Sequence, residues 1–243
     1  HIVAGVDQGG HDLSGEGAGD QLDRHDDTVS SLILAAAEGE GDGSGMHGGH
    51  AAGHAGDAEA PENQHGNVAG TGGSKKFGQV PLTYIDTIMR LNVLATTVLT
   101  HGLLPNLVRN APSHILNISS LAAMIPTGYK TVYPASKAYI KHFSLGMREE
   151  FRPMGISVCL ALLGPMPTRA EIIARIERQG ALGRILSVSP DKAAKSCIDG
   201  MFCGKRIIVP GMMNRLSYYL LKFVPEQLKS KMMSRSVLTK EIG

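Results

Sequence analysis

Two tyrosines in this chain stand four residues ahead of a lysine, a spacing that suits proton-transfer chemistry. Tyr133 and Lys137 form the first pair, in YPASK, and Tyr218 and Lys222 form the second. A free tyrosine has a pKa of about 10 and carries protons poorly at neutral pH, but a neighbouring ammonium group favours the phenolate and lowers that pKa. Because the spacing occurs twice, the surrounding sequence has to distinguish the two pairs.

The residues around the first pair favour it. VYPASKAYIKHFSLGMREEF has helical periodicity, which places Tyr133 and Lys137 one turn apart on the same side of a helix. The apolar run HILNISS before it predicts a buried strand ending at Ser120, at the carboxyl edge where open α/β sheets hold their sites. The second pair lies in the apolar stretch LSYYLLKFVP, with a lysine at the offset that Ser120 occupies. We therefore predict chemistry at Tyr133 and Lys137, and packing and surface roles for Tyr218 and Lys222.

Alternating strands and helices must position these residues. From Leu82 to Pro105 the apolar residues are spaced three and four apart, which predicts a long helix ending near that proline. HILNISS, ISVCLALL and RIIVP are short apolar runs typical of strands covered on both faces, and helices are predicted between them. This alternation predicts an α/β domain with a parallel sheet.

Four residues on three of these elements follow the order of a known catalytic set. Asn92 lies in the predicted helix MRLNVLATT, Ser120 ends the strand, and Tyr133 and Lys137 open the next helix. In this order and context the chain resembles the short-chain dehydrogenase/reductase family, from about Phe77 to the C-terminus. The resemblance implies that these four residues are catalytic.

The stretch LLGPMPT, after the second predicted strand, extends the resemblance. The family has a Pro-Gly turn there, followed by a threonine that contacts the nicotinamide; Gly164 and Thr168 match, while Leu163 stands where proline is usual. The resemblance implies a Rossmann-like three-layer parallel sheet and an NAD or NADP cofactor, between which the sequence does not choose. It also implies a set of cofactor-binding residues: Tyr133, Lys137, Gly164 and Thr168.

The activity that the resemblance implies is an NAD(P)-dependent oxidoreductase interconverting a carbonyl and an alcohol. Tyr133 would give a proton to the carbonyl oxygen, Ser120 would hydrogen-bond the same oxygen, and Asn92 would hold a water that links Lys137 to solvent. In the family the C-terminal stretch closes over the substrate. Here it reads GMMNRLSYYLLKFVPEQLKSKMMSR, and its apolar character predicts a lipophilic substrate.

The first 76 residues differ sharply from the rest. Up to Gly73 the chain holds 18 of its 30 glycines and 13 acidic residues, with Arg24 as the only Lys or Arg. This composition predicts a disordered low-complexity segment, 1–76, ahead of a catalytic half, 77–243. His47, His50 and His54 suggest metal binding, but glycines between them oppose the helix that would align them, so no metal site is predicted.

The part of the family's domain that binds most of the cofactor is not recognisable. There is no glycine-rich turn after a first strand, and AGTGGSKKFG stands near the place of the family's Asn-Asn-Ala-Gly turn. With three predicted strands where the family has seven, the domain reads as truncated to its second half, and we expect weak or no NAD(P)H binding. An alternative is an inactive remnant or interaction protein that keeps the catalytic residues.

The remaining expectations concern location and partners. Cys159, Cys197 and Cys203 lack paired spacing, which favours reduced thiols and a cytoplasmic location. No apolar run approaches the roughly 18 residues of a membrane span. For the apolar and basic C-terminal stretch three hypotheses stay open: packing on the domain, a homo-oligomer contact, or a membrane-surface helix. No nucleic-acid partner is expected.

Overall fold

The computed structural model describes residues 2–3, 64–67, 73–168 and 170–242. Its centre is one parallel sheet of five strands in the order β1-β2-β3-β4-β5. The strands are β1 (Ile2–Val3), β2 (Gln64–Asn67), β3 (Ser113–Ser120), β4 (Ile156–Leu163) and β5 (Ile207–Ile208). The α/β class with a parallel sheet, predicted from the sequence, is confirmed.

Helices connect the strands and follow the last one. In chain order they are η1 (Phe77–Gln79), α2 (Leu82–Met89), the π-helical segment η2 (Arg90–Leu94), α3 (Ala95–Arg109), η3 (Leu121–Met124), α4 (Val132–Phe151), η4 (Arg152–Met154), α5 (Ala170–Arg178), α6 (Ala181–Leu186), α7 (Pro190–Phe202), α8 (Met212–Phe223), α9 (Glu226–Val237) and the π-helical segment η5 (Leu238–Ile242).

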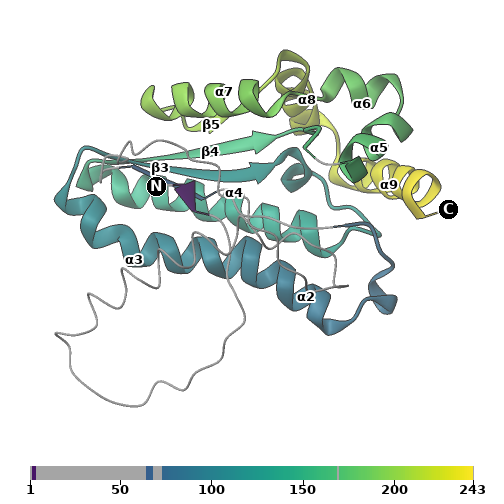
Figure 1. The fold of residues 1–243 in the computed structure, drawn as a ribbon, viewed down its shortest axis with the longest axis horizontal. Helices are drawn as coiled ribbons and strands as arrows, with labels where there is room; N and C mark the ends of the chain where they lie inside the picture. Colours follow the sequence, from purple (N-terminus) through teal and green to yellow (C-terminus); the bar gives the residue numbers. More distant parts are fainter. Residues whose placement is uncertain (1, 4–63, 68–72, 169, 243) are drawn as a thin grey trace, which may run out of the picture.

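The elements form three layers (Figure 1). Helices α3 and α4 cover one face of the sheet, and α7 covers the other. The carboxyl ends of β3 and β4 point toward the side of the molecule where α5, α6, α8 and α9 lie. A site at this edge of the sheet therefore has the C-terminal helices beside it.

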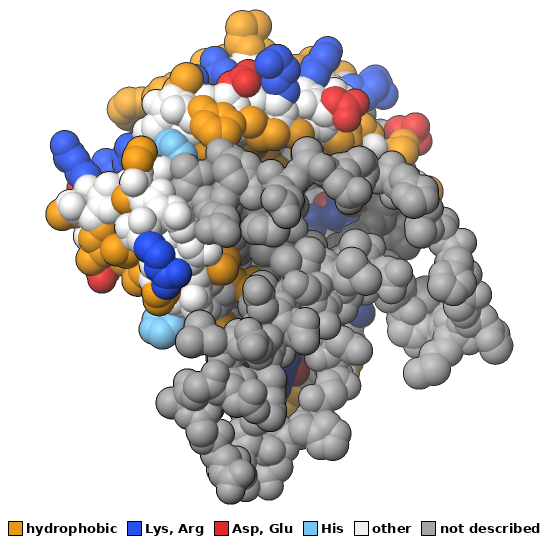
Figure 2. Space-filling model, turned by 60° about the vertical axis from the view of Figure 1, so that its left-hand side comes forward, with side chains coloured by type: hydrophobic (Ala, Val, Ile, Leu, Met, Phe, Trp, Pro, Cys, Tyr) orange, Lys and Arg blue, Asp and Glu red, His pale blue; other side chains and the backbone are white. Residues whose placement is uncertain are grey.

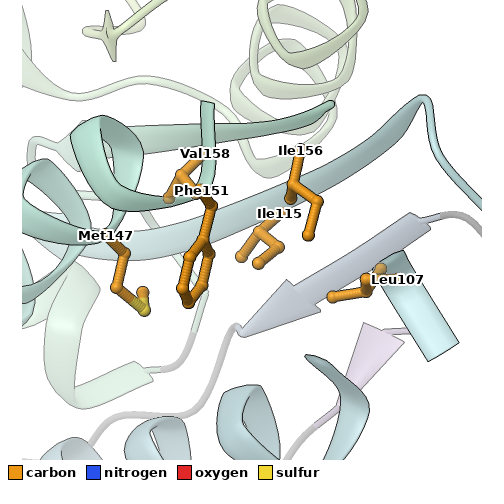
Figure 3. Close-up of a cluster of buried hydrophobic side chains, with 6 residues drawn as sticks. All are labelled: Leu107, Ile115, Met147, Phe151, Ile156 and Val158. Atoms are coloured by element: carbon orange, nitrogen blue, oxygen red, sulfur yellow. The ribbon is translucent and has the colours of Figure 1, made fainter. Parts of the chain in front are cut away.

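The core between the sheet and the α3–α4 layer is a cluster of apolar side chains (Figure 3). Its buried members are Leu107, Ile115, Met147, Phe151, Ile156 and Val158. Because successive strand residues point to opposite faces, the next residues along each strand, Leu116 and Cys159, pack against α7 on the other side. Both faces of β3 and β4 are thus covered, which explains why these strands are almost continuously apolar.

The strand count predicted from the sequence was wrong. Strands β1 and β2 lie inside the segment predicted to be disordered, and β2 pairs with β3 from Gln64↔His114 to Asn67↔Asn117. QHGN carries no β-branched or aromatic residue, so propensity gave no signal, and pairing with a regular neighbour supplies the strand. The three histidines that were considered as metal ligands, His47, His50 and His54, lie outside the described residues.

The helix predicted to end near Pro105 continues through it to Arg109. The proline is exposed, as is His101, so the His101 carbonyl that loses its helical partner can meet water. With η2, the two helices α2 and α3 form one stretch, Leu82–Arg109, that is long and apolar enough by length and composition to cross a membrane, contrary to our expectation. Its side that carries Leu99 and Leu107 is buried in the domain.

Two neighbouring residues of α3 should differ in how much stability is lost when each is replaced by alanine. Leu107→Ala removes a side chain from the cluster of Figure 3 and should lower the free energy of unfolding by about 2–5 kcal/mol. Val108→Ala, on the exposed side of the same turn, should change it by less than about 0.5 kcal/mol. Urea unfolding followed by circular dichroism measures both, and equal losses would contradict this packing of α3.

Candidate active site

Ser120 ends β3 at the carboxyl edge of the sheet and caps η3. Its Oγ donates to the Leu163 carbonyl at 3.3 Å and accepts from the Ala122 backbone N–H at 3.1 Å. Leu163 is also its partner in the strand pairing between β3 and β4. The hydroxyl is therefore held at the place where both central strands stop.

Tyr133 lies in the first turn of α4, with its side chain beside that of Ser120. Burial raises the pKa of the Tyr133 phenol, and the Ser120 hydrogen bond and the positive charge of Arg175 offset only part of that rise. The positive charge that acts on this phenol comes from Arg175, and burial prevails over it. The phenol thus holds its proton beside the Ser120 hydroxyl.

Lys137 follows one turn along α4 and is buried. Its Nζ donates to the Ile118 carbonyl at 3.4 Å, and burial lowers its pKa from 10.5 to about 8. An amine with a pKa near 8 takes up and releases protons close to neutral pH, which suits a group that relays protons to a tyrosine. Geometry and charge therefore place Ser120, Tyr133 and Lys137 in one small region at the carboxyl edge.

Asn92 reaches the same helix from the other side. It lies in the π-helical segment η2, and its Nδ2 donates to Ser136 Oγ at 2.8 Å, while that hydroxyl donates to the Tyr133 carbonyl at 2.8 Å. Single turns of π-helix are frequent at functional sites because they change the direction of one side chain within a helix. Asn92 is fully buried and is linked through Ser136 to the turn that carries Tyr133.

The turn after β4 holds the two other predicted cofactor residues. Gly164 faces the amide of Asn214 on α8, and a Cβ added to it would lie 2.5–2.7 Å from the atoms of that amide. Asn214 is buried; its Nδ2 donates to the Pro210 carbonyl at 3.0 Å, and its Oδ1 has no hydrogen-bond partner. Thr168 is exposed at the far end of the turn, with its backbone N–H bonded to the Met166 carbonyl at 2.9 Å. The turn is therefore anchored by α8 at one end and open at the other.

The second tyrosine–lysine pair has no such setting. Tyr218 is buried in a cluster with Ile140 and Leu160, and the exposed Lys222 ammonium lies 4.3 Å from the centre of its ring. The prediction that this pair serves packing and the surface is confirmed.

A carboxylate from the C-terminal segment fixes the approach to Tyr133. Glu241, in η5, pairs with Lys130 at 3.0 Å and with Arg175 of α5 at 3.5 Å, and it accepts a hydrogen bond from the Ser74 hydroxyl. Burial raises the pKa of the Glu241 carboxyl, but the Ser74 and Lys130 hydrogen bonds and the two positive charges outweigh it, so the pKa is lowered. We call this set the Glu241 clasp.

The loop before α4 is held from both sides. The Lys75 backbone N–H donates to the Tyr129 carbonyl at 2.7 Å, and the Gly128 N–H donates to the Ser234 hydroxyl of α9 at 2.7 Å. Tyr129 has a positive φ of 65°, a conformation that costs energy for a bulky residue and needs such support. A small pocket beside this loop reaches Tyr133 and has room for about one water molecule.

Sequence reasoning missed the residues that position the site. Ser136 lies within YPASK itself, yet only the structure shows that it bridges Asn92 to α4. Nothing in the sequence indicated a role for Arg175, because no pattern places α5 near Tyr133. A role for Glu241 was only weakly indicated, since it and Glu226 are the only acidic residues after Asp199. No group of three or more His, Cys, Asp or Glu forms a metal site in the described ranges.

The structure thus brings Ser120, Tyr133 and Lys137 together at the carboxyl edge of a parallel α/β sheet, with Asn92 linked to the same turn of α4. Residues 66–178 match the family model described as short chain dehydrogenase. The part of the chain from Gly66 to Arg178 is therefore similar to the short-chain dehydrogenase/reductase family. The match begins at Gly66 in β2, ahead of the boundary predicted at Phe77.

Three curated relatives show the range of the similarity. The very-long-chain 3-oxoacyl-CoA reductase of Anas platyrhynchos is 39% identical over 74 residues, which cover 30% of this chain and 24% of that protein. The putative steroid dehydrogenase 4 of Caenorhabditis elegans is 30% identical over 146 residues, 58% of this chain and 52% of that protein. The inactive hydroxysteroid dehydrogenase-like protein 1 of Rattus norvegicus is 35% identical over 82 residues, covering 34% and 25%. The chain spans from about a quarter to about half of the length of these relatives.

Solved structures show the same fold at low identity. A 7beta-hydroxysteroid dehydrogenase superposes with a TM-score of 0.63 at 18% identity, over 70% of this chain and 66% of that one. An NADPH-bound short chain oxidoreductase of Pseudomonas aeruginosa has a TM-score of 0.52 at 21% identity, over 62% and 65%. These likenesses establish the fold, and the second shows a nicotinamide cofactor bound by a protein of this fold.

The contact between Gly164 and α8 can be tested by a double-mutant cycle. Gly164→Ala should cost about 1–3 kcal/mol of stability, because its Cβ overlaps the Asn214 amide, and Asn214→Ala should recover most of that loss by removing the amide. Gly146→Ala in α4, where the added Cβ meets nothing within 4 Å, should be neutral or stabilising. Thermal unfolding of the four variants measures the coupling, and strict additivity of the first two substitutions would contradict the contact.

The Glu241 clasp predicts a pH dependence of stability. Because its pKa is lowered in the folded protein, Glu241 binds protons more readily in the unfolded chain. Its contribution to stability is therefore complete above the ordinary glutamate range and is lost as the pH falls from that range through the lowered pKa of the folded protein. Glu241→Gln should lower stability at pH 7 by about 1–3 kcal/mol and flatten the acid limb of the stability profile. Glu226→Gln, the same change at an exposed position of α9, should leave that limb intact. Unfolding midpoints between pH 7 and pH 3 provide the comparison, and indistinguishable profiles for the two variants would count against the clasp.

Proposed function

We propose that this protein takes part in a nicotinamide-dependent interconversion of a carbonyl and an alcohol, with Tyr133 carrying the proton. The observation that carries the proposal is the position of Ser120 and Tyr133 beside each other and near a buried Lys137, at the carboxyl edge of a parallel sheet. This arrangement offers two hydroxyl groups to one substrate oxygen and a titrating amine behind them.

The residues at this edge fit the nicotinamide end of an NAD or NADP molecule. Thr168 offers a hydroxyl group and Lys137 an ammonium group to hydroxyl and amide groups of the cofactor. Gly164 adds no side chain to the turn after β4. Residues for the opposite end of the cofactor are not identified in the described part of the chain. When bound, the nicotinamide supplies or accepts the hydride.

The chain's own residues account for the proton and for charge stabilisation. In the reductive direction, Tyr133 gives its phenolic proton to the oxygen of the substrate carbonyl, which becomes the alcohol. Ser120 donates a hydrogen bond to that oxygen and stabilises negative charge as it develops. Lys137, with a pKa of about 8, returns a proton toward the tyrosine, and Asn92 orients this turn of α4 through Ser136. The reverse order of these proton transfers oxidises an alcohol.

A lipophilic carbonyl compound is the proposed substrate. Helix α6, on the side toward which β3 and β4 point, exposes apolar side chains such as Leu182 and Ile185. The names of two relatives refer to very-long-chain 3-oxoacyl-CoA and to steroid, and both of these contain a large apolar body. An acyl chain or a steroid therefore suits this side of the molecule better than a polar sugar.

A non-catalytic role is the competing proposal, and two observations favour it. The raised pKa of Tyr133 keeps the phenolate that alcohol oxidation needs scarce at neutral pH. A relative that shares 35% identity over 82 residues is named as inactive. In that case the site residues would persist as parts of the α4 packing, and the protein would act as a binding partner.

Turnover with matched tyrosine variants separates these roles. At a high concentration of NADH or NADPH, which offsets the weak binding expected from the sequence, we expect the full chain to oxidise the cofactor, followed at 340 nm, with one or more members of a panel of long-chain and polycyclic ketones. Tyr133→Phe should lower the rate by about 100-fold or more, because proton transfer by a positioned side chain contributes that much. Tyr218→Phe removes the same hydroxyl from the second tyrosine–lysine pair and should leave the rate unchanged.

Each result has a clear meaning. Equal rates for wild type and Tyr133→Phe would exclude Tyr133 as the proton carrier. A folded wild-type chain without turnover on any ketone, and without NADPH binding by calorimetry, would favour the non-catalytic role.

A further inference from the structure

The outer side of α8 is a continuous apolar face. Met212 is 80% exposed and Phe223 is 85% exposed, although both are large hydrophobic residues. Together with the residues between them on the same side they form what we call the α8 face: Met212, Leu216, Tyr219, Leu220 and Phe223. Apolar side chains grouped in this way on a helix mark an interaction site rather than ordinary surface.

Helix geometry shows that the domain itself does not cover this face. At 3.6 residues per turn, the five positions fall within one sector of α8, directly opposite Asn214 and Tyr218, which are its buried residues. Packing on the domain, one of our three hypotheses for this stretch, therefore accounts for the inner side of α8 alone. The outer side points away from the sheet.

Basic residues border the α8 face. The exposed Lys222 stretches over Tyr219, with its ammonium 5.3 Å from the ring centre, and Lys229 of α9 donates to the Leu221 carbonyl of α8 at 3.1 Å. Residues 212–237, which include α8 and α9, contain five basic residues and one acidic residue, Glu226. Figure 2 shows the neighbouring upper surface, at the level of α7 in Figure 1, where hydrophobic, basic and acidic side chains are mixed.

We propose that the α8 face binds the surface of an anionic lipid membrane. Its apolar side chains would enter the boundary between headgroups and acyl chains, while the bases meet acidic headgroups. A second copy of the chain is the less suitable occupant, because a symmetric contact would bring the same basic border of both copies together. Lysine above an aromatic ring suits the lipid interface, since its stem lies along apolar surface while its charge remains in water.

Vesicle flotation of the full chain tests this proposal without reference to activity. The chain should float with vesicles of phosphatidylcholine and phosphatidylserine at low salt and bind less at high salt, because salt screens the headgroup charge. Phe223→Ser should reduce vesicle binding by at least about 10-fold, the effect of removing one large apolar side chain from lipid. Lys222→Gln should reduce it by about 5-fold, and only for vesicles that contain phosphatidylserine.

Leu82→Ser is the matched control. Leu82 is 81% exposed, so it resembles Phe223 in exposure, but it lies at the start of the separate apolar stretch α2–α3. This variant should bind vesicles like wild type, and far-ultraviolet circular dichroism should show all three variants folded. The proposal is overturned if the folded wild type does not float with the acidic vesicles, or if Leu82→Ser loses as much binding as Phe223→Ser. It is also overturned if sedimentation shows a dimer that Phe223→Ser dissociates while vesicle binding persists.

Discussion

The position of α4 on β3 depends on a row of buried polar groups that hydrogen-bond to one another. Asn117 donates to Ser144 Oγ at 2.9 Å, the Ser119 hydroxyl donates to the Lys137 carbonyl at 2.8 Å, and the Lys137 ammonium donates back to the Ile118 carbonyl. Sliding α4 by one turn would leave these groups without partners in a region closed to water, and buried polar groups that lack partners lower the stability of the fold. The tyrosine hydroxyl and the strand-end serine meet because this row admits one register.

The same region shows where sequence patterns are informative about the fold. HILNISS and ISVCLALL are apolar on both faces because α3–α4 and α7 cover them, so composition predicted β3 and β4. Their alternation with helices predicted the parallel arrangement. Strand β2 escaped prediction because QHGN has neither the pattern nor the propensity of a strand and depends on its neighbour for pairing. The helix end predicted near Pro105 was wrong for a related reason. Burial of Leu107, two residues further on, outweighs the tendency of proline to end a helix.

For the site, residue types could be predicted and their electrostatics could not. The order of Asn92, Ser120, Tyr133 and Lys137 along the chain is visible in the sequence, and the structure groups them around one turn of α4. The direction in which a pKa moves depends on how much water each group keeps and on charges from distant segments. Burial raises the pKa of Tyr133 and lowers that of Lys137, so both groups are biased toward their uncharged forms.

The Glu241 clasp also has a consequence for the order of folding. Ser74 and Glu241 are 167 residues apart in the chain, whereas β3, α4 and β4 are consecutive. Interactions between distant segments require a larger loss of chain entropy before they form, so local units such as β3–α4–β4 assemble ahead of them. A molecule with a finished sheet therefore still lacks the fixed loop that leads into Tyr133. We therefore expect the active-site surroundings to be completed after the core that supports them.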